Sequence, residues 1–406
     1  MQNRTVETLL TRIIEDYGKM AFLSGPRQVG KTTLALTYQK HFKQSIYFNW
    51  DDATHQKKLL KDPYFFESEN RDPAKPFLVI FDEIHKYARW KNYLKGAYDR
   101  SRKEFRFLIT GSGRLDLFKK GGDSLLGRYF SLPLFPLSVG ELHGGRPSWS
   151  DFLQASAELP PASAHGRKGY ESLLRFSGFP EPFLRGEEAF YRLWATERKQ
   201  RLIREDIRNA SAIRELSQME MLSHLIPDRV ASPLSLNGLR EDIGVAHETV
   251  RDWIQLLDQF YYLFSIQTFT GSLTRALQKE KKVYLYDGGE ILNEGARFEN
   301  LIALHLLKAV QTWKAAGDEP ISLRYLRDKE KRETDFLLVR GKQPMILIET
   351  KWRDTTLDSS LIYFQKRLRV PTAVQLVDTA GVCRKTTEGE YTRWVVSADR
   401  WLSLLP

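Results

Sequence analysis

The sequence contains a single cysteine, Cys383, among its 406 residues. One thiol cannot form an internal disulfide, and a cysteine-based zinc site needs at least two thiolates. No apolar run approaches the roughly 18 residues that a membrane-spanning helix requires, and the first residues lack the apolar segment of a secretory signal. We therefore expect a cytoplasmic protein with no membrane partner.

Positive charge, in contrast, is in excess. The chain has 62 Lys and Arg residues against 51 Asp and Glu residues, which gives a net charge of +11. Such a field attracts polyanions, so nucleic acid, an acidic protein surface and anionic lipid are all candidate partners. The hydrophobic content of 42% is typical of a globular protein, and the length predicts about two to four domains.

Short apolar runs alternate with helix-like polar segments in the first part of the chain. The runs cover residues 20–23, 45–49, 77–81, 105–109 and 129–134. They are rich in Val, Ile and Phe and mostly do not alternate with polar residues, as expected of strands buried on both faces. Strands separated by helices predict an α/β fold with a doubly wound parallel sheet.

A glycine-rich loop follows the first of these runs. It matches the pattern G-x-x-x-x-G-K-[ST] and consists of Gly25, Pro26, Arg27, Gln28, Val29, Gly30, Lys31, Thr32 and Thr33. Glycines let the loop turn its N–H groups inward around phosphates, and the following helix adds a favourable dipole. We expect the loop to bind ATP, with Lys31 reaching the β- and γ-phosphates and the Thr32 hydroxyl ligating Mg²⁺.

Two carboxylates end the run at residues 77–81. Asp82 is expected to hold Mg²⁺, and Glu83 to polarise the attacking water; the alternative is that the two acids cap a helix. The run at 105–109 leads into Thr110-Gly111-Ser112. A hydroxyl at this strand end would sense the γ-phosphate, and we assign that role to Ser112 rather than Thr110.

Two further segments, 125–129 and 133–142, contribute to a resemblance to a known family that also rests on the motifs above. With the loop and with Phe-Asp-Glu-Ile-His at 81–85, they resemble prokaryotic AAA+ ATPases that carry a C-terminal domain of unknown function. The resemblance covers nearly the whole chain. It implies an arginine finger that completes a neighbouring subunit's site, a role for Arg128 or Arg114, and hence a homo-oligomer that could be a ring. A structural salt bridge is the alternative role for the arginine.

The segment 234–257 predicts two helices separated by the turn Gly244-Val245. The β-like run at 260–270 would add a wing, so the order is that of a winged helix-turn-helix. The second helix would present His247, Glu248, Arg251 and Asp252 outward, and this set is not notably basic. A DNA reader and a plain scaffold therefore remain open.

Acidic residues and a lysine gather at predicted strand ends near the C-terminus. Glu349 and Lys351 share one face of a strand, Asp335 lies on the preceding strand, and Glu299 lies on the helix before it. Such a set suits Mg²⁺ binding and activation of water for attack on a phosphodiester.

The order αβββαβ and the pattern Asp335…Glu349-x-Lys351 resemble the PD-(D/E)xK nuclease superfamily. The resemblance implies that Asp335 and Glu349 ligate Mg²⁺, with Glu299 as an auxiliary acid. Lys351 would orient the water or stabilise the developing charge. The segment Glu333-Thr334-Asp335 lacks the proline of that pattern. An inactive nuclease-like fold that only binds DNA or protein, and a solvated charged face, are the alternatives.

We therefore predict four parts in one chain. They are an AAA+ ATPase core at 1–150, a helical lid or linker at 151–228, a winged helix-turn-helix at 229–280 and a restriction-endonuclease-like αβββαβ domain at 281–406. The predicted function is ATP-dependent action on DNA by an oligomer, through remodelling, translocation or Mg²⁺-dependent cleavage. The alternatives are a regulatory ATPase switch that binds a protein partner and has an inactive nuclease-like domain, and an ATP-driven helicase or branch-remodelling motor.

Overall fold

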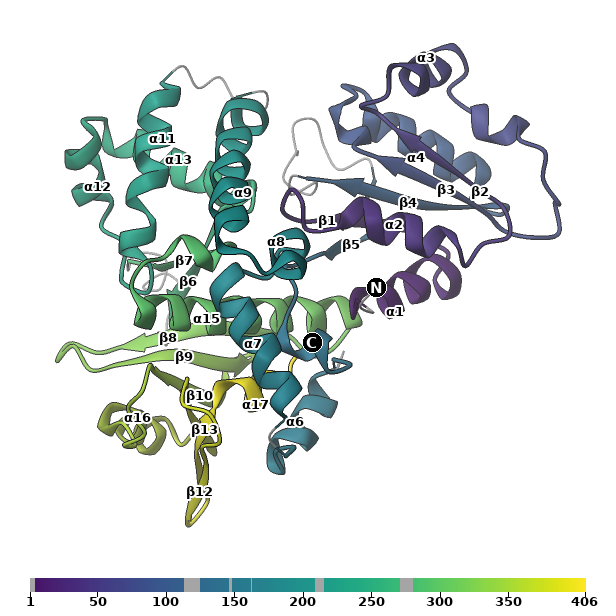
Figure 1. The fold of residues 1–406 in the computed structure, drawn as a ribbon. Helices are drawn as coiled ribbons and strands as arrows, with labels where there is room; N and C mark the ends of the chain where they lie inside the picture. Colours follow the sequence, from purple (N-terminus) through teal and green to yellow (C-terminus); the bar gives the residue numbers. More distant parts are fainter. Residues whose placement is uncertain (1–3, 113–124, 146–147, 162, 209–214, 271–279) are drawn as a thin grey trace. The chain divides into compact units, whose positions relative to one another are not determined.

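The computed structural model describes residues 4–112, 125–145, 148–161, 163–208, 215–270 and 280–406. The chain divides between Phe135 and Pro136 into two compact units, here called unit 1 and unit 2 (Figure 1). Within the described ranges, no helix has both the length and the apolar character needed to cross a membrane.

Unit 1 is built on a five-stranded parallel sheet with the strand order β2-β3-β4-β1-β5. The strands are β1 (Met20–Ser24), β2 (Ser45–Asn49), β3 (Phe77–Asp82), β4 (Phe105–Gly111) and β5 (Tyr129–Pro133). Every residue of β1 and β3 is buried, as strands covered on both faces require. The predicted α/β fold with a parallel sheet is confirmed.

Helices cover both faces of this sheet (Figure 1). On one face, α3 (Ala53–Lys61) and α4 (Trp90–Ser101) close an aromatic core that includes Phe22, Phe81 and Phe107. On the other face lie α2 (Lys31–Gln39) and α1 (Val6–Thr11), which continues into a π-helix at Arg12–Asp16. Because the strands are parallel, the carboxyl ends of β1, β3 and β4 lie at the same end of the sheet, next to the loop that precedes α2.

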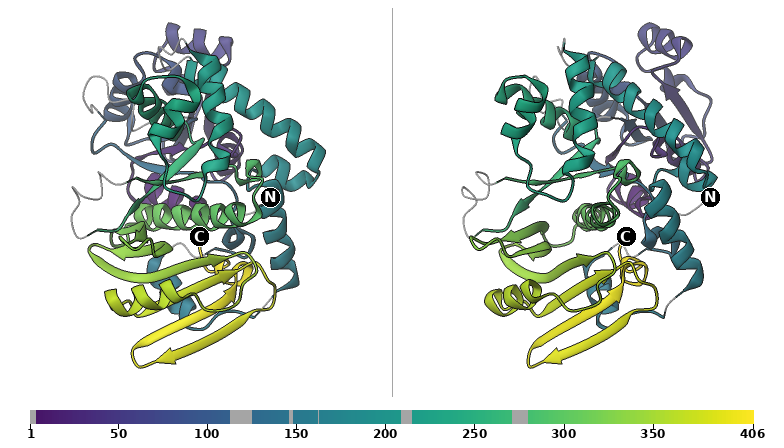
Figure 2. Two further views of the ribbon diagram at one scale, coloured as in Figure 1. Left: turned by 90° about the vertical axis from the view of Figure 1, so that its left-hand side faces the viewer. Right: turned by 60° about the vertical axis from the view of Figure 1, so that its left-hand side comes forward.

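Unit 2 contains an eight-stranded sheet with the order β12-β13-β11-β10-β9-β8-β6-β7. The strands are β6 (Leu263–Thr268), β7 (Lys282–Leu285), β8 (Ile321–Arg327), β9 (Glu333–Arg340), β10 (Gln343–Lys351), β11 (Thr372–Val377), β12 (Cys383–Glu388) and β13 (Tyr391–Ser397). Pairs β8–β9 and β9–β10 are antiparallel, whereas β10–β11 is parallel. The hairpin β12–β13 extends from one edge of the sheet (Figure 2).

Two helices sandwich the middle of this sheet. The long α15 (Glu294–Ala316) lies across one face (Figure 2). On the other face α16 (Ser359–Leu368) packs against β9, β10 and β11, with Phe364 beside Leu337 and Leu347. The order from α15 through β8, β9, β10 and α16 to β11 is αβββαβ, and its relation to nucleases stays a prediction.

The remaining elements of unit 2 are mostly helical. They are α5 (Val139–Leu142), α6 (Trp149–Ala157), α7 (Ala164–Phe176), α8 (Pro180–Arg185), α9 (Glu188–Arg201), α11 (Leu216–Leu225), α12 (Leu236–Ile243), α13 (His247–Gln259) and α17 (Ala398–Leu402). Unit 2 also has a π-helix at Leu202–Ile207 and 3-10 turns at Pro227–Arg229 and Gly288–Glu290, and unit 1 has 3-10 turns at Phe65–Ser68 and Ile84–Lys86. The elements α12, α13 and β6 fall where the sequence predicts helix, helix and strand. The bridge from Pro233 to Lys282 adds a short pairing before α12. A winged-helix role for this arrangement stays a prediction.

Helix α6 lies inside residues 146–167, a segment whose Pro, Ser, Ala, Gly and His content predicts a loop or a domain joint. Ser148 caps the helix, because its hydroxyl accepts a hydrogen bond from the Asp151 N–H. Trp149 and Phe152 are buried against Trp313. The prediction of a loop was wrong here because the aromatic partner of this helix lies about 160 residues away in the sequence.

The segment after β5, which carried part of the AAA+ resemblance, is buried within unit 2. Glu141 forms an ion pair with Lys308 of α15 at 2.6 Å, and Lys308 also donates to the Ser138 hydroxyl at 2.9 Å. The Val139 N–H donates to His305 Nε2 at 3.0 Å. These contacts hold residues 138–141 against α15, so these residues have a structural role.

Candidate functional site

The glycine-rich loop connects β1 to α2 in unit 1, as the sequence predicts. A Cβ atom on Gly25 would lie 2.2 Å from the carbonyl oxygen of Leu134, so this close approach of two backbones admits only glycine. Gly30 precedes α2 with φ of 98°, a conformation that side chains disfavour. The loop geometry thus explains why both glycines of the motif are needed.

Lys31 is buried at the first position of α2. Its ammonium donates to the carbonyl oxygens of Gly25 at 3.0 Å and Pro26 at 2.8 Å. The charge is therefore held directly beside the loop that would surround a phosphate chain. Phosphate oxygens are stronger acceptors for an ammonium than neutral carbonyls, so a nucleotide would compete for this lysine.

Asp82 ends β3 in a buried position, and three hydroxyl groups surround it. Thr32 and Tyr47 each donate to Oδ2 at 2.7 Å, and Thr110 donates to Oδ1. Burial and the neighbouring carboxylate raise the pKa of Tyr47, which keeps its proton on the phenol. Tyr47 was not among the predicted site residues. A hydroxyl-bearing side chain in the apolar strand β2 is the feature that could have indicated it.

Thr32 and Asp82 place two oxygen atoms side by side at the carboxyl edge of the sheet. Hydroxyl and carboxylate oxygens suit Mg²⁺, which keeps part of its water shell and binds nucleotide phosphates in such sites. The residues present therefore fit the metal that accompanies ATP. Thr32 would ligate it directly, and Asp82 would hold it through its water shell.

Glu83 follows Asp82 with φ of 55°, so the chain turns sharply at the strand end. Its Oε2 lies 3.5 Å from Ser112 Oγ, 3.6 Å from Lys86 Nζ and 3.7 Å from His85 Nε2. Burial lowers the pKa of His85, which favours its neutral form. Of the two hydroxyls considered from the sequence, Thr110 is engaged by Asp82, and Ser112 is the one that approaches Glu83.

Arg128, the residue assigned as an arginine finger, forms a two-pronged ion pair with Asp99 of α4. Its Nε and Nη2 atoms lie 2.7 and 2.8 Å from the two carboxylate oxygens. This geometry matches the alternative structural role, and the finger role stays a prediction. Arg114 lies outside the described residues.

A second cluster of charged residues forms in unit 2, where β9 and β10 lie side by side. Asp335 Oδ2 accepts from the Thr350 N–H at 3.0 Å and from the Thr350 hydroxyl at 2.7 Å. Glu349 Oε1 pairs with Lys351 at 3.0 Å, and Lys351 also contacts Asp358 at 2.9 Å. The structure thus brings together the residues that the sequence predicted.

A lysine that the sequence analysis did not select occupies the centre of this cluster. The ammonium of Lys282 lies 3.1 Å from Glu299, 2.6 Å from Glu333 and 3.1 Å from Asp335. Its side chain is only 1% exposed. Its position at the end of the charged run 279–282, as the first residue of the otherwise apolar strand β7, is the feature that could have indicated it.

Burial governs the protonation of the acids in this cluster. It raises the pKa of Glu299 to about 8, and the charge on Asp335 acts in the same direction. Burial likewise raises the pKa of Glu349 well above its usual range. Tyr284 donates to Glu299 at 2.8 Å. Burial therefore disfavours the charged forms of Glu299 and Glu349, and Lys282 and Lys351 oppose this effect.

Lys282 bears directly on whether a metal ion fits here. Among the residues that the structure describes, no three His, Cys, Asp or Glu side chains are grouped to hold a metal. Asp335 Oδ1 faces the Lys282 ammonium, and its Oδ2 faces Thr350. The residues present do not fit a metal ion while Lys282 stays in this position, so we derive no metal-dependent step at this cluster. The assignment of Asp335, Glu349 and Glu299 as metal ligands stays a prediction.

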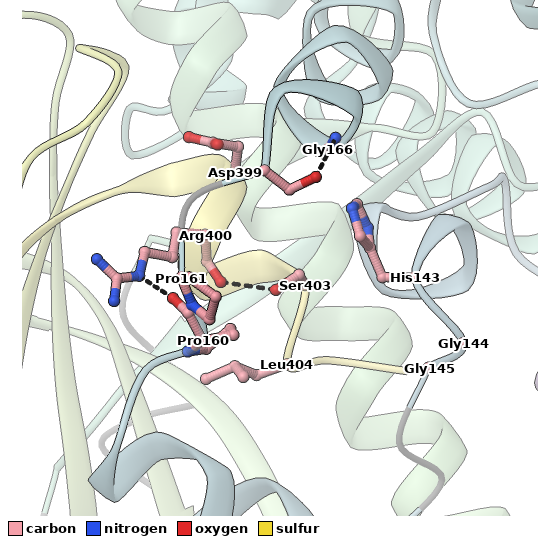
Figure 3. Close-up of a pocket in the computed structure, with 11 residues that line it drawn as sticks. His143, Gly144, Gly145, Pro160, Pro161, Gly166, Asp399, Arg400, Ser403 and Leu404 are labelled. Carbon is pink, nitrogen blue, oxygen red and sulfur yellow. Dashed lines mark hydrogen bonds between the residues drawn. The ribbon is translucent and has the colours of Figure 1, made fainter.

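Unit 2 also contains a pocket of about 430 Å³ (Figure 3). It lies between the chain around His143, the N-terminal end of α7 and the residues of α17. Arg400 donates to the carbonyl oxygen of Pro160, and Ser403 donates to the carbonyl oxygen of Arg400. None of the residues predicted to be functional lines this pocket, and its polar groups serve mainly to hold the pocket wall.

Three family models match successive parts of the chain. Residues 17–143 match the model described as AAA domain. Residues 167–293 and 294–398 match two domains of unknown function, DUF8612 and DUF4143. The first match covers the loop, Asp82 and Glu83. It therefore supports an AAA+ ATPase that binds nucleotide.

The chain is also similar to the uncharacterized protein Rv2008c of Mycobacterium tuberculosis. The two are 25% identical over 335 residues, which are 80% of this chain and 68% of the relative. Among solved structures, PCH-2 of C. elegans has 20% identity and a TM-score of 0.22, with 37% of this chain and 45% of PCH-2 covered. AMPPCP-bound DnaA from Aquifex aeolicus has 16% identity and a TM-score of 0.31, with 62% and 86% covered. These overlaps are too weak to bear on function.

Proposed function

We propose that this protein hydrolyses ATP in unit 1 and uses the hydrolysis to act on DNA. The observation that carries the ATPase half is the contact between Thr32 and Asp82, which joins the two halves of a nucleotide site. Lys31 would bind the β- and γ-phosphates, and Glu83 would orient and deprotonate the attacking water. The Mg²⁺ that accompanies ATP would neutralise charge on the phosphate oxygens.

Ser112 supports this chemistry from the end of β4. Its hydroxyl is 3.5 Å from Glu83, so a group at the γ-phosphate would lie near both residues. We assign Ser112 to sensing the γ-phosphate through the position of Glu83. Arg128 would act in a neighbouring copy of the chain, which makes the active form a homo-oligomer.

The distribution of charge supports a polyanionic partner, with its contact in unit 1. Residues 1–135 contain 24 basic and 15 acidic residues, whereas residues 136–406 contain 38 and 36. Between residues 86 and 106, eight basic residues accompany only two acidic ones. Lys91, Lys95 and Arg102 fall on one side of α4 by helical spacing. We propose that this side of α4 contacts the DNA phosphates.

A second candidate function rests on the helices of the predicted winged module. Residues 236–259 contain two arginines and five carboxylates, so α12 and α13 carry net negative charge. Such a surface repels DNA phosphates and suits a basic protein surface. This observation favours a regulatory ATPase switch that binds a protein partner. The third candidate function is an ATP-driven helicase or branch-remodelling motor in which the acidic cluster of unit 2 is inactive.

ATP turnover measured with and without DNA separates these functions. The rate would be compared for the free protein and for the protein with single-stranded, duplex and branched DNA. DNA-directed action predicts a rate that rises with at least one of these DNAs, whereas the switch predicts the same rate with all of them. A strand-displacement assay with the form that stimulates most would then identify a motor.

Glu83→Gln is the control for the chemistry. It should retain ATP binding and lose at least about 10²-fold in turnover, because the water loses its base. Lys31→Ala should instead lose ATP binding. Full turnover in Glu83→Gln would contradict the role of Glu83 while leaving the nucleotide site itself intact.

A further inference from the structure

We infer that the Lys282 ammonium takes the place of a divalent cation in the acidic cluster of unit 2. This inference starts from the proposed function, because it concerns the same Asp335, Glu349 and Lys351 for which a metal-dependent role is predicted. It gives the cluster a different chemistry: the chain itself supplies the compensating positive charge.

The first support for this inference comes from the contacts of the two carboxylate oxygens of Asp335. Its Oδ1 contacts Lys282 at 3.1 Å, and its Oδ2 accepts two hydrogen bonds from Thr350. A metal ion needs carboxylate oxygens at about 2.0–2.1 Å for Mg²⁺. It could reach Asp335 Oδ1, at the centre of the cluster, only by displacing the ammonium.

The position of Lys282 in the backbone makes such displacement difficult. Its strand β7 pairs with β6 through Ile266, and its backbone also pairs with Pro233 before α12. The side chain leaves this fixed backbone with 1% exposure and lies over the ring of Tyr325 at 5.8 Å. Backbone pairing on both sides of its strand holds the Cα of Lys282 in place, and burial of the side chain keeps the ammonium among the acids.

The ion pairs of the cluster also oppose replacement of Lys282 by a metal ion. Lys282 contacts Glu299, Glu333 and Asp335 together, and removal of one member of a buried ion cluster leaves uncompensated charge. Glu333 is also bound by Arg327 at 3.1 Å, and Glu349 by Lys351. Lys282, Arg327 and Lys351 thus neutralise the carboxylates that a metal ion would otherwise neutralise. In this arrangement the cluster has no place for the metal ion that cleavage of a phosphodiester would use.

The matched pair Lys282→Met and Lys281→Met tests this inference. Lys281 is the exposed residue that directly precedes β7, so both variants lose one charge. Mn²⁺ binding to the nucleotide-free full chain would be counted by electron paramagnetic resonance. We expect Lys282→Met to bind about one more Mn²⁺ per chain than Lys281→Met, and to gain thermal stability on Mn²⁺ addition. Equal binding in the two folded variants would overturn the inference.

A second comparison does not depend on the folding of Lys282→Met. The wild-type chain and Asp335→Asn should bind the same number of Mn²⁺ ions, because Asp335 holds no metal while Lys282 is present. One Mn²⁺ fewer in Asp335→Asn would overturn the inference. ATP turnover is measured separately on the same proteins, so a failure of the ATPase proposal is recognised by its own loss of turnover and does not alter the ion count.

Discussion

At the scale of single residues, His305 shows how burial fixes a protonation state. Its Nδ1 donates to the Leu301 carbonyl at 2.7 Å, and its Nε2 accepts the Val139 N–H at 3.0 Å. Acceptance at Nε2 requires that this nitrogen carry no proton, and therefore requires the neutral ring, whereas Nδ1–H can donate to Leu301 in either form. Burial lowers the pKa of His305 to about 4, from 6.5 in the unfolded chain, although Glu141 acts in the opposite direction and Lys308 in the same one.

The resulting pH dependence has a defined sign. Because the folded pKa is depressed, the unfolded chain binds the proton first as the pH falls. The free energy of unfolding should therefore decrease between about pH 6.5 and pH 4, by at most about 3 kcal/mol. Denaturant unfolding of the wild type and of His305→Gln, measured across this window, checks it. Parallel curves for the two proteins would show that His305 does not contribute.

At the scale of elements, α4 is the helix that we propose contacts the DNA phosphates. Reversal of Lys91, Lys95 and Arg102 to Glu should weaken DNA binding and reduce the slope of log K against log salt by about 3, because about three phosphate contacts are lost. Fluorescence anisotropy with labelled DNA at several salt concentrations measures both quantities.

The control for α4 is a second basic helix end with the same number of charges. Lys366, Arg367 and Arg369 lie exposed at the end of α16 in unit 2. Their reversal changes the net charge of the chain equally, so a general loss of attraction would affect both variants alike. A larger loss of affinity from the α16 variant would place the DNA contact in unit 2.

At the scale of the whole molecule, the role of Arg128 depends on assembly. If Arg128 completes a neighbour's site, Arg128→Ala should lower ATP turnover about 10³-fold, whereas Asp99→Asn, which removes only the ion pair within the chain, should retain it. Chains of Arg128→Ala mixed with chains of Lys31→Ala should regain turnover, since each supplies what the other lacks. No gain on mixing, with equal losses in Arg128→Ala and Asp99→Asn, would assign Arg128 a structural role.

Much of the fold was open to prediction because its signals are local. Strands β1, β3 and β4 were predicted from runs of apolar residues, and α15 from a helical period. Helix α6 was not predicted, because the burial of Trp149 depends on Trp313 far along the chain. Strand β12 was also missed, since most of its residues are exposed and polar.

The nucleotide site was largely determined by the sequence alone. Its binding groups lie within one loop and at adjacent strand ends, so the spacing of Gly25, Lys31, Asp82 and Glu83 sets their geometry once the strands are parallel. Only the tertiary structure decided which side chains face these groups. Tyr47 on Asp82, Asp99 on Arg128 and Lys282 among the acids of unit 2 are all partners distant in sequence, and no local pattern encodes contacts that form only when separate elements pack together.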